Sequence, residues 1–140
     1  MSPSGRLIAG ISDVGAVQIW TADGRKVSEF DLESGGWIRE FSPDEKMLFT
    51  TTTQYGLESR ELTIWLVRSG QRAYSFWGTA GIVDWNRRAM LIGTLSGELR
   101  EFSLPLVGRN TSEIYRQFGE RPFREYSDSE LARYASGGGR

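Results

Sequence analysis

The chain has 140 residues, of which 39% are hydrophobic and 25% are charged, which is the composition of an ordinary globular protein rather than of a disordered or collagen-like one. The 17 Lys and Arg nearly cancel the 18 Asp and Glu, so no overall field attracts nucleic acid or anionic lipid. The absence of His and Cys excludes His-dependent catalytic triads and zinc sites built from these residues.

No targeting or membrane segment is expected. The start, Met1 to Arg6, has no charged leader followed by an apolar run, and nowhere do about eighteen apolar residues follow one another. The absence of Cys suits a reducing compartment. We therefore expect a soluble, intracellular and cytoplasmic protein without membrane insertion.

A polar turn that leads into an apolar strand occurs three times, at residues 2–10, 42–50 and 86–93. In chain order, alternation at period two predicts strands at 7–12, 17–21 and 26–32, four strands within 37–76, and strands at 81–85, 90–94 and 98–104. An aromatic residue stands near the end of one strand in each unit, at Trp20, Trp65 and Phe102. Their spacings of 45 and 37 residues bracket the length of a four-stranded propeller blade.

These residues resemble the WD-repeat β-propeller family over residues 2 to 108. The turn Phe41-Ser42-Pro43-Asp44, with Lys46, looks like the Phe-Ser-Pro-Asp-Gly-Arg start of such a repeat, and Ile19-Trp20 and Ile64-Trp65 look like its Trp-Asp strand ends. Thr21 and Leu66 stand where the family usually has Asp, and the family's Gly-His pair cannot exist here. The hydrogen-bonded tetrad that often locks such blades should therefore be missing or replaced.

We accordingly expect an all-β fold of about three four-stranded antiparallel propeller blades at residues 1–108. The first blade would lack its innermost strand and the last its outermost. Residues 109–140 would be a polar C-terminal extension, extended or disordered, with a short helix after Ser127. Because closed propellers have about four to eight blades, an incomplete set should be covered by other protein subunits or by copies of the chain.

The acidic and basic residues that could form a chemical site are explained more simply as residues of turns. The acidic residues lie in no calcium-binding spacing, and we expect them at turns and loop ends: Asp13, Asp23, Asp31, Asp44 and Asp84. Arg87 and Arg88, beside Trp85, could stack on a nucleotide, but their position favours a solvated turn. No glycine-rich segment matches a phosphate-binding loop, and we expect no cofactor and no metal.

The aromatic residues are the better candidates for recognition. Trp20 and Trp65 are predicted to pack between blades, while Trp77 suits packing and partner binding equally. Aromatics scattered through the polar tail suit a docking extension, and a disordered end explains them equally well. The candidate partner-binding residues are Trp77, Tyr115, Phe118, Phe123, Tyr126 and Tyr134.

The leading functional hypothesis is a non-catalytic protein–protein interaction scaffold that is a subunit of a larger multi-protein assembly. The alternative is an enzyme or small-molecule binder, with a site at a propeller's central channel that other subunits complete. Nucleic-acid binding is disfavoured by the balanced charge.

Overall fold

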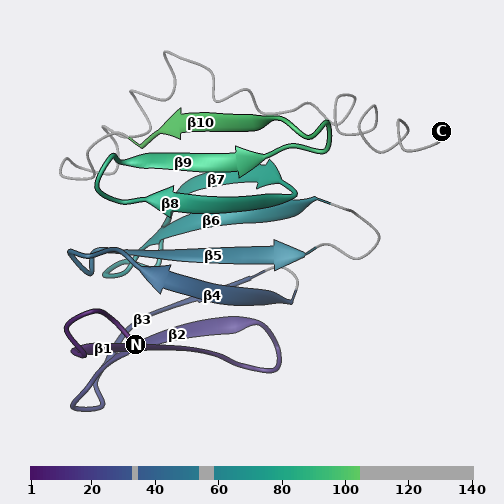
Figure 1. The fold of residues 1–140 in the computed structure, drawn as a ribbon. Coiled ribbons are helices and arrows are strands. Elements are labelled where there is room, and N and C mark those ends of the chain that lie inside the picture. The colour runs from purple at the N-terminus through teal and green to yellow at the C-terminus, as the bar shows by residue number, and fades with distance from the viewer. Residues whose placement is uncertain (33–34, 54–58, 105–140) are drawn as a thin grey trace. The chain divides into compact units, whose positions relative to one another are not determined.

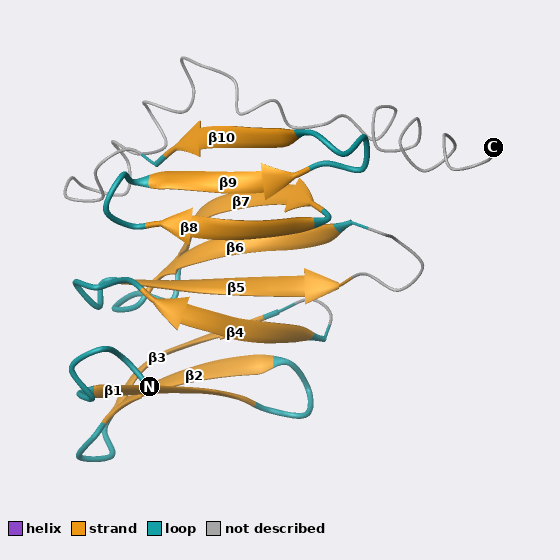
Figure 2. Cartoon of the chain, in the orientation of Figure 1, coloured by secondary structure: helices purple, strands orange, loops and turns teal. Residues whose placement is uncertain are grey.

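The computed structural model describes residues 1–32, 35–53 and 59–104, and these residues form ten β-strands and no helix (Figures 1 and 2). The predicted tail, with its helix and with five of the six candidate partner-binding aromatics, lies outside the described residues. The strands are β1 (Leu7–Ile11), β2 (Ala16–Thr21), β3 (Lys26–Asp31), β4 (Gly36–Phe41), β5 (Met47–Thr53), β6 (Arg60–Leu66), β7 (Arg72–Gly78), β8 (Ala80–Asp84), β9 (Ala89–Gly93) and β10 (Leu99–Ser103).

The strands make three antiparallel sheets in which each strand pairs with its neighbour in sequence. Sheet 1 has the order β1-β2-β3, sheet 2 the order β4-β5-β6-β7, and sheet 3 the order β8-β9-β10. Within the described residues, the prediction of an all-β fold is confirmed, and so are the strand counts of three, four and three. The described residues form no closed barrel.

The repeated turn predicted from Ser-Pro is visible in the hydrogen bonds. In the first copy the amide of Ser2 donates to the carbonyl of Leu7 (2.9 Å), and the amide of Leu7 donates to Oγ of Ser2 (3.0 Å). In the second copy Ser42 and Met47 exchange the same two bonds, each of 2.9 Å. Both serines are buried, because each satisfies the backbone of a tight turn with its own hydroxyl.

Another turn joins β1 to β2, β2 to β3 and β9 to β10. In each case a Ser or Thr stands three residues before a Gly with positive φ, and the Gly amide donates to the carbonyl of that residue. The residue after the Gly donates its amide to the Ser or Thr hydroxyl. Hydroxyl and glycine together define these hairpins, which occupy residues 12–16, 21–25 and 94–98.

One hydrophobic core lies between sheets 1 and 2. It contains Val17, Ile19 and Phe30 from sheet 1, which pack against Leu48 and Trp65 from sheet 2. The rings of Phe30 and Trp65 stack with their centroids 4.1 Å apart and their planes at 15°. Because successive side chains of a strand point to opposite faces of the sheet, apolar residues at alternate positions all lie on the face toward this core.

A second set of buried residues lies between sheets 2 and 3. The ring centroids of Phe76 and Phe102 are 5.3 Å apart, and Met90 of β9 is fully buried. The sheets approach closely at Gly81, where a Cβ atom would lie 2.6 Å from Cδ1 of Leu62, and at Gly78, where it would lie 2.3 Å from Cγ2 of Ile92. Sheet 2 therefore has a sheet packed on each face, with Trp37 of β4 left exposed, whereas sheets 1 and 3 are each covered by it on one face.

Candidate functional site

Trp77 is the one predicted partner-binding residue within the described part of the chain. It lies inside β7, is half-buried, and stands opposite Glu61 of β6. The strands predicted within 37–76 and at 81–85 leave residues 77–80 as a loop, whereas in the structure Thr79 alone separates β7 from β8. Trp77 is thus a strand residue with a partly accessible ring.

The two tryptophans near strand ends, Trp20 and Trp65, differ in how deeply they are buried. Trp65 is buried between sheets 1 and 2, so its predicted packing role is confirmed. Trp20 is only half-buried and is not part of the core between sheets 1 and 2, so its packing between blades stays a prediction. Its strand partner Ile8 lies on the face of sheet 1 that sheet 2 does not cover, because Val17 and Ile19 point into the core from the alternate positions.

The predicted turn residues occupy the expected places. The carboxylate of Asp84 accepts a hydrogen bond of 2.9 Å from the amide of Arg87, in the turn between β8 and β9, and Arg87 also pairs with Glu101 (3.1 Å). The carboxylate of Asp44 accepts bonds from the Ser42 hydroxyl (2.6 Å) and the Lys46 amide (3.2 Å). Within residues 1–32, 35–53 and 59–104, no group of three acidic side chains could hold a metal ion.

The outer surface of sheet 1 consists of Ile8, Gln18, Trp20, Lys26 and Glu29. Ile8 and Trp20 are directly paired across β1 and β2, and the Lys26 ammonium lies 5.7 Å from the centre of the Trp20 ring. Hydrogen bonding from Lys26 and Gln18 lowers the pKa of Glu29. Ile8 is 43% exposed. This surface therefore combines an apolar pair, Ile8 and Trp20, with a charged pair, Lys26 and Glu29.

The outer surface of sheet 3 is more apolar. Register and alternation place Ile82, Leu91 and Leu99 on the face opposite to Met90 and Phe102. Leu99 is 71% and Ile82 is 64% exposed. Large aliphatic side chains grouped on one sheet face in this way are typical of contact surfaces.

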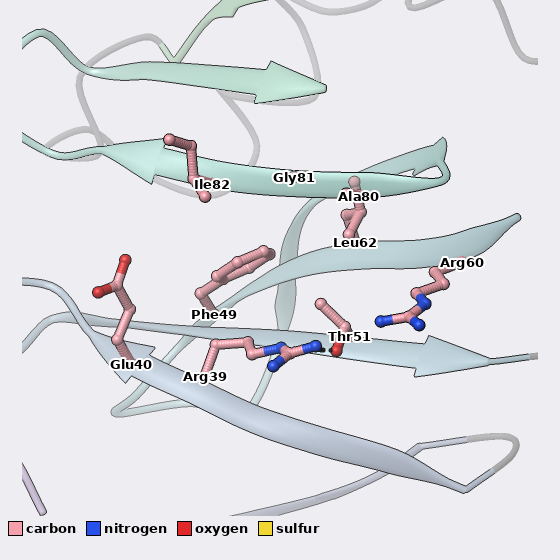
Figure 3. A pocket seen from close by; sticks show the side chains of 9 residues that line it. All are labelled: Arg39, Glu40, Phe49, Thr51, Arg60, Leu62, Ala80, Gly81 and Ile82. Carbon is pink, nitrogen blue, oxygen red and sulfur yellow. Dashed lines mark hydrogen bonds between the residues drawn. The ribbon is translucent and has the colours of Figure 1, made fainter. Parts of the chain in front are cut away.

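A pocket of about 330 Å³ lies between sheet 2 and β8 (Figure 3). Its polar lining comes from Arg39 and Glu40 of β4, Thr51 of β5 and Arg60 of β6, and Figure 3 shows both arginine side chains extending toward Thr51. The rest of the lining is Phe49, Leu62, Ala80, Gly81 and Ile82. Three strands of sheet 2 and the first strand of sheet 3 line this hollow, and β4 and β6 each bring one guanidinium group to it.

A β-bulge positions Arg39. The β4–β5 register shifts between Ile38 and Glu40, which makes Arg39 the extra residue, and its Nε donates a bond of 2.9 Å to Oγ1 of Thr51. Glu40 accepts a bond of 3.0 Å from Nε1 of Trp85. Among the described residues, no carboxylate lies within ion-pair distance of Arg39 or Arg60.

Sequence reasoning missed this pocket and the exposed Trp37 beside it. Arg39 and Arg60 lie 21 residues apart, belong to no motif, and meet only through the strand register. The exposure of Trp37, which is 55%, also depends on what covers the β4 edge of sheet 2 rather than on its own strand pattern.

No helix in the described part of the chain is long and apolar enough to span a bilayer. The sequence matches no protein-family model and no curated protein.

Proposed function

We propose that this chain is a non-catalytic protein–protein interaction scaffold of WD-repeat propeller type. In this proposal the outer surfaces of sheets 1 and 3 contact other protein chains or further copies of this one within a larger assembly. The observation that carries the proposal is the contrast between the sheets. A sheet packs on each face of sheet 2, apart from the exposed Trp37 of β4, whereas the outer faces of sheets 1 and 3 have no sheet over them and leave Ile8, Ile82 and Leu99 in water.

The repeated architecture supports propeller blades. Three antiparallel meanders follow one another, and the Ser2 and Ser42 turns share their hydrogen bonds. Sheets 1 and 2 pack face to face through apolar side chains, as neighbouring blades do in a propeller. Each added sheet in such an array buries the free face of the sheet before it, so terminal faces without a cap favour association.

Burial of the apolar side chains on these outer surfaces would supply the free energy of association. Burial of apolar surface contributes roughly 25 cal/mol per Å², and full burial of an aliphatic side chain about 1.5–3 kcal/mol. Removal of Ile82, Leu91 and Leu99 from water by one partner surface would therefore supply several such contributions. The outer surface of sheet 1 adds Ile8 and the Trp20 ring.

The test is the mass of the purified chain by light scattering over a range of concentrations, with variants that place a charge on each surface. We expect concentration-dependent association of the natural chain, which Leu99→Lys and Ile8→Lys weaken. Val14→Lys is the matched control, because Val14 is exposed in the turn before β2. A chain that stays monomeric and folded at all concentrations, and that binds no protein from its native extract in a Leu99-dependent way, would overturn the proposal.

A further inference from the structure

We propose that the pocket between sheet 2 and β8 binds the carboxylate of a small organic acid, with Arg39 and Arg60 as its cationic ligands. This proposal does not depend on the scaffold function. Ile82 belongs both to the pocket lining and to the outer surface of sheet 3, but Ile8 and Leu99, which the association test changes, lie outside the lining.

Arg39 is held with part of its guanidinium group available. The β-bulge and the bond from its Nε to Thr51 fix the side chain across β5. This bond uses one of the five N–H donors, and the described residues supply no carboxylate for the others. The remaining edge, formed by the two terminal nitrogens, has the fork geometry that suits a planar carboxylate.

Arg60 contributes a second cation and lies near a further polar group. It is paired with Thr53, the last residue of β5, and strand alternation places Thr53 on the same face as Thr51. Oγ1 of Thr53 is buried and has no hydrogen-bond partner among the described residues. A buried hydroxyl without a partner costs free energy, and Thr53 stands beside the pocket rather than in its lining.

The charge balance favours a monoanion. The pocket holds two guanidinium groups and one carboxylate, that of Glu40, which already accepts a bond from Trp85. The net charge of the lining is therefore +1, which matches one carboxylate rather than a dianionic phosphate. The two like charges also share one concave space, where attraction to an anion between them offsets their repulsion.

The apolar part of the lining indicates that the ligand has an apolar body, and Trp37 lies outside the lining on the same strand as Arg39. Trp37 stands opposite Thr51 across β4 and β5, so its ring lies on the same face of sheet 2 as the pocket, and it is 55% exposed. The buried side chains of Phe49 and Leu62 close the floor. A volume of about 330 Å³ is enough for an acid with one aromatic ring and a short chain.

The experiment is titration of the full chain with 3-phenylpropionate, followed by NMR chemical-shift changes and calorimetry at low salt. We expect saturable binding that weakens about tenfold or more in Arg39→Gln and in Arg60→Gln, as loss of a charge-assisted hydrogen bond implies. Arg68→Gln removes the same charge from the exposed turn after β6 and should bind as the natural chain does. The neutral 3-phenylpropionamide should not bind detectably.

Further ligands and variants test the apolar contact and the preference for a carboxylate. Trp37→Ala should weaken binding of 3-phenylpropionate but not of acetate, because acetate has no ring to contact the indole. Inorganic phosphate should bind more weakly than the carboxylate. Thermal unfolding of each variant confirms that it folds, and Arg39→Lys provides a milder second variant. Absence of saturable binding, tighter binding of phosphate, or equal weakening in Arg68→Gln would each overturn the proposal.

Discussion

Nε1 of Trp65 on β6 donates a hydrogen bond of 2.9 Å to Oγ1 of Thr50 on β5, and both side chains are buried. The Trp65 ring is held on its faces as well, by the stacked ring of Phe30 and by the guanidinium of Arg72, 5.2 Å from the ring centre. A direct indole–hydroxyl bond therefore joins the two central strands of sheet 2, in a chain whose sequence cannot form a His-dependent tetrad.

Trp65→Phe should lower the free energy of unfolding by about 1–3 kcal/mol. The substitution keeps an aromatic ring against Phe30 but removes the donor, which leaves the buried Thr50 hydroxyl without its indole partner. The measurement is urea unfolding followed by far-UV circular dichroism. Unchanged stability would show that the bond contributes nothing.

The control for this bond is Thr50→Val, which removes the hydroxyl with little change of shape. If the bond couples the two side chains, the double variant should lose less stability than the sum of the two single losses. Additive losses in this double-mutant cycle would contradict the coupling.

The strands could be predicted from the sequence because their signals are local. Alternation and the hydroxyl–glycine turns at 12–16, 21–25 and 94–98 depend on a few adjacent residues. The opposite behaviour of Trp20 and Trp65 was not predictable in this way. Both end similar strands, but only Trp65 faces a sheet that covers it, and that depends on how the sheets stack.

Gly81→Ala should lower the free energy of unfolding by roughly 1–3 kcal/mol, as overpacked cores typically do. The added Cβ would lie 2.6 Å from Cδ1 of Leu62 and 3.3 Å from the carbonyl oxygen of Leu91, so the fully buried Leu62 side chain, or the contact between sheets 2 and 3, would have to shift. Urea unfolding measures the loss.

Gly10→Ala is the matched control, since Gly10 also lies in a strand, β1, and a Cβ there meets nothing within 4 Å. We expect unchanged or slightly increased stability, by up to about 1 kcal/mol, because Ala loses less conformational freedom on folding than Gly. Equal losses in the two variants would show that strand glycine alone, and not the sheet contact, determines the effect.

Glu45 should make folding stability depend on acid pH. Hydrogen bonds from Ser4, reinforced by Arg6, lower the pKa of Glu45 from its usual 4.5 to about 2. Because the folded-state pKa is lower than the unfolded one, the stabilising contribution is complete above about pH 4.5 and is lost as the pH falls toward 2. Unfolding midpoints in urea between pH 6 and pH 2 measure this loss.

The comparison for this titration is Glu45→Gln, which should show a shallower fall of stability over the same pH range. Asp13→Asn, in the exposed turn after β1, should keep the slope of the natural chain. If Glu45→Gln leaves the slope unchanged, the contacts of Glu45 with Ser4 and Arg6 do not link the turn at residues 2–7 to the turn at residues 42–47.

The pocket was harder to predict than the strands for a physical reason. Arg39 contacts Thr51 across β4 and β5, and Arg60 is brought near them by the pairing of β5 with β6. These pairings join residues far apart in the chain, and no local pattern in the sequence marks them.

The ion pair between Arg72 and Glu61 should stabilise the fold more than an exposed pair does. Nη1 of Arg72 lies 2.9 Å from Oε1 of Glu61, whose side chain is only 14% exposed, and the guanidinium also covers the Trp65 ring. Arg72→Ala removes the pair and the ring contact together and leaves a largely buried carboxylate with the Ser75 hydroxyl as a remaining partner. We expect a loss of about 1–2 kcal/mol.

Arg25→Ala is the control, because it breaks the pair with Asp23 in an exposed turn and should cost less than about 0.5 kcal/mol. Urea unfolding at low and high salt distinguishes the two, because screening weakens exposed pairs most. Equal losses in the two variants would mean that burial of Glu61 adds nothing to the strength of its pair.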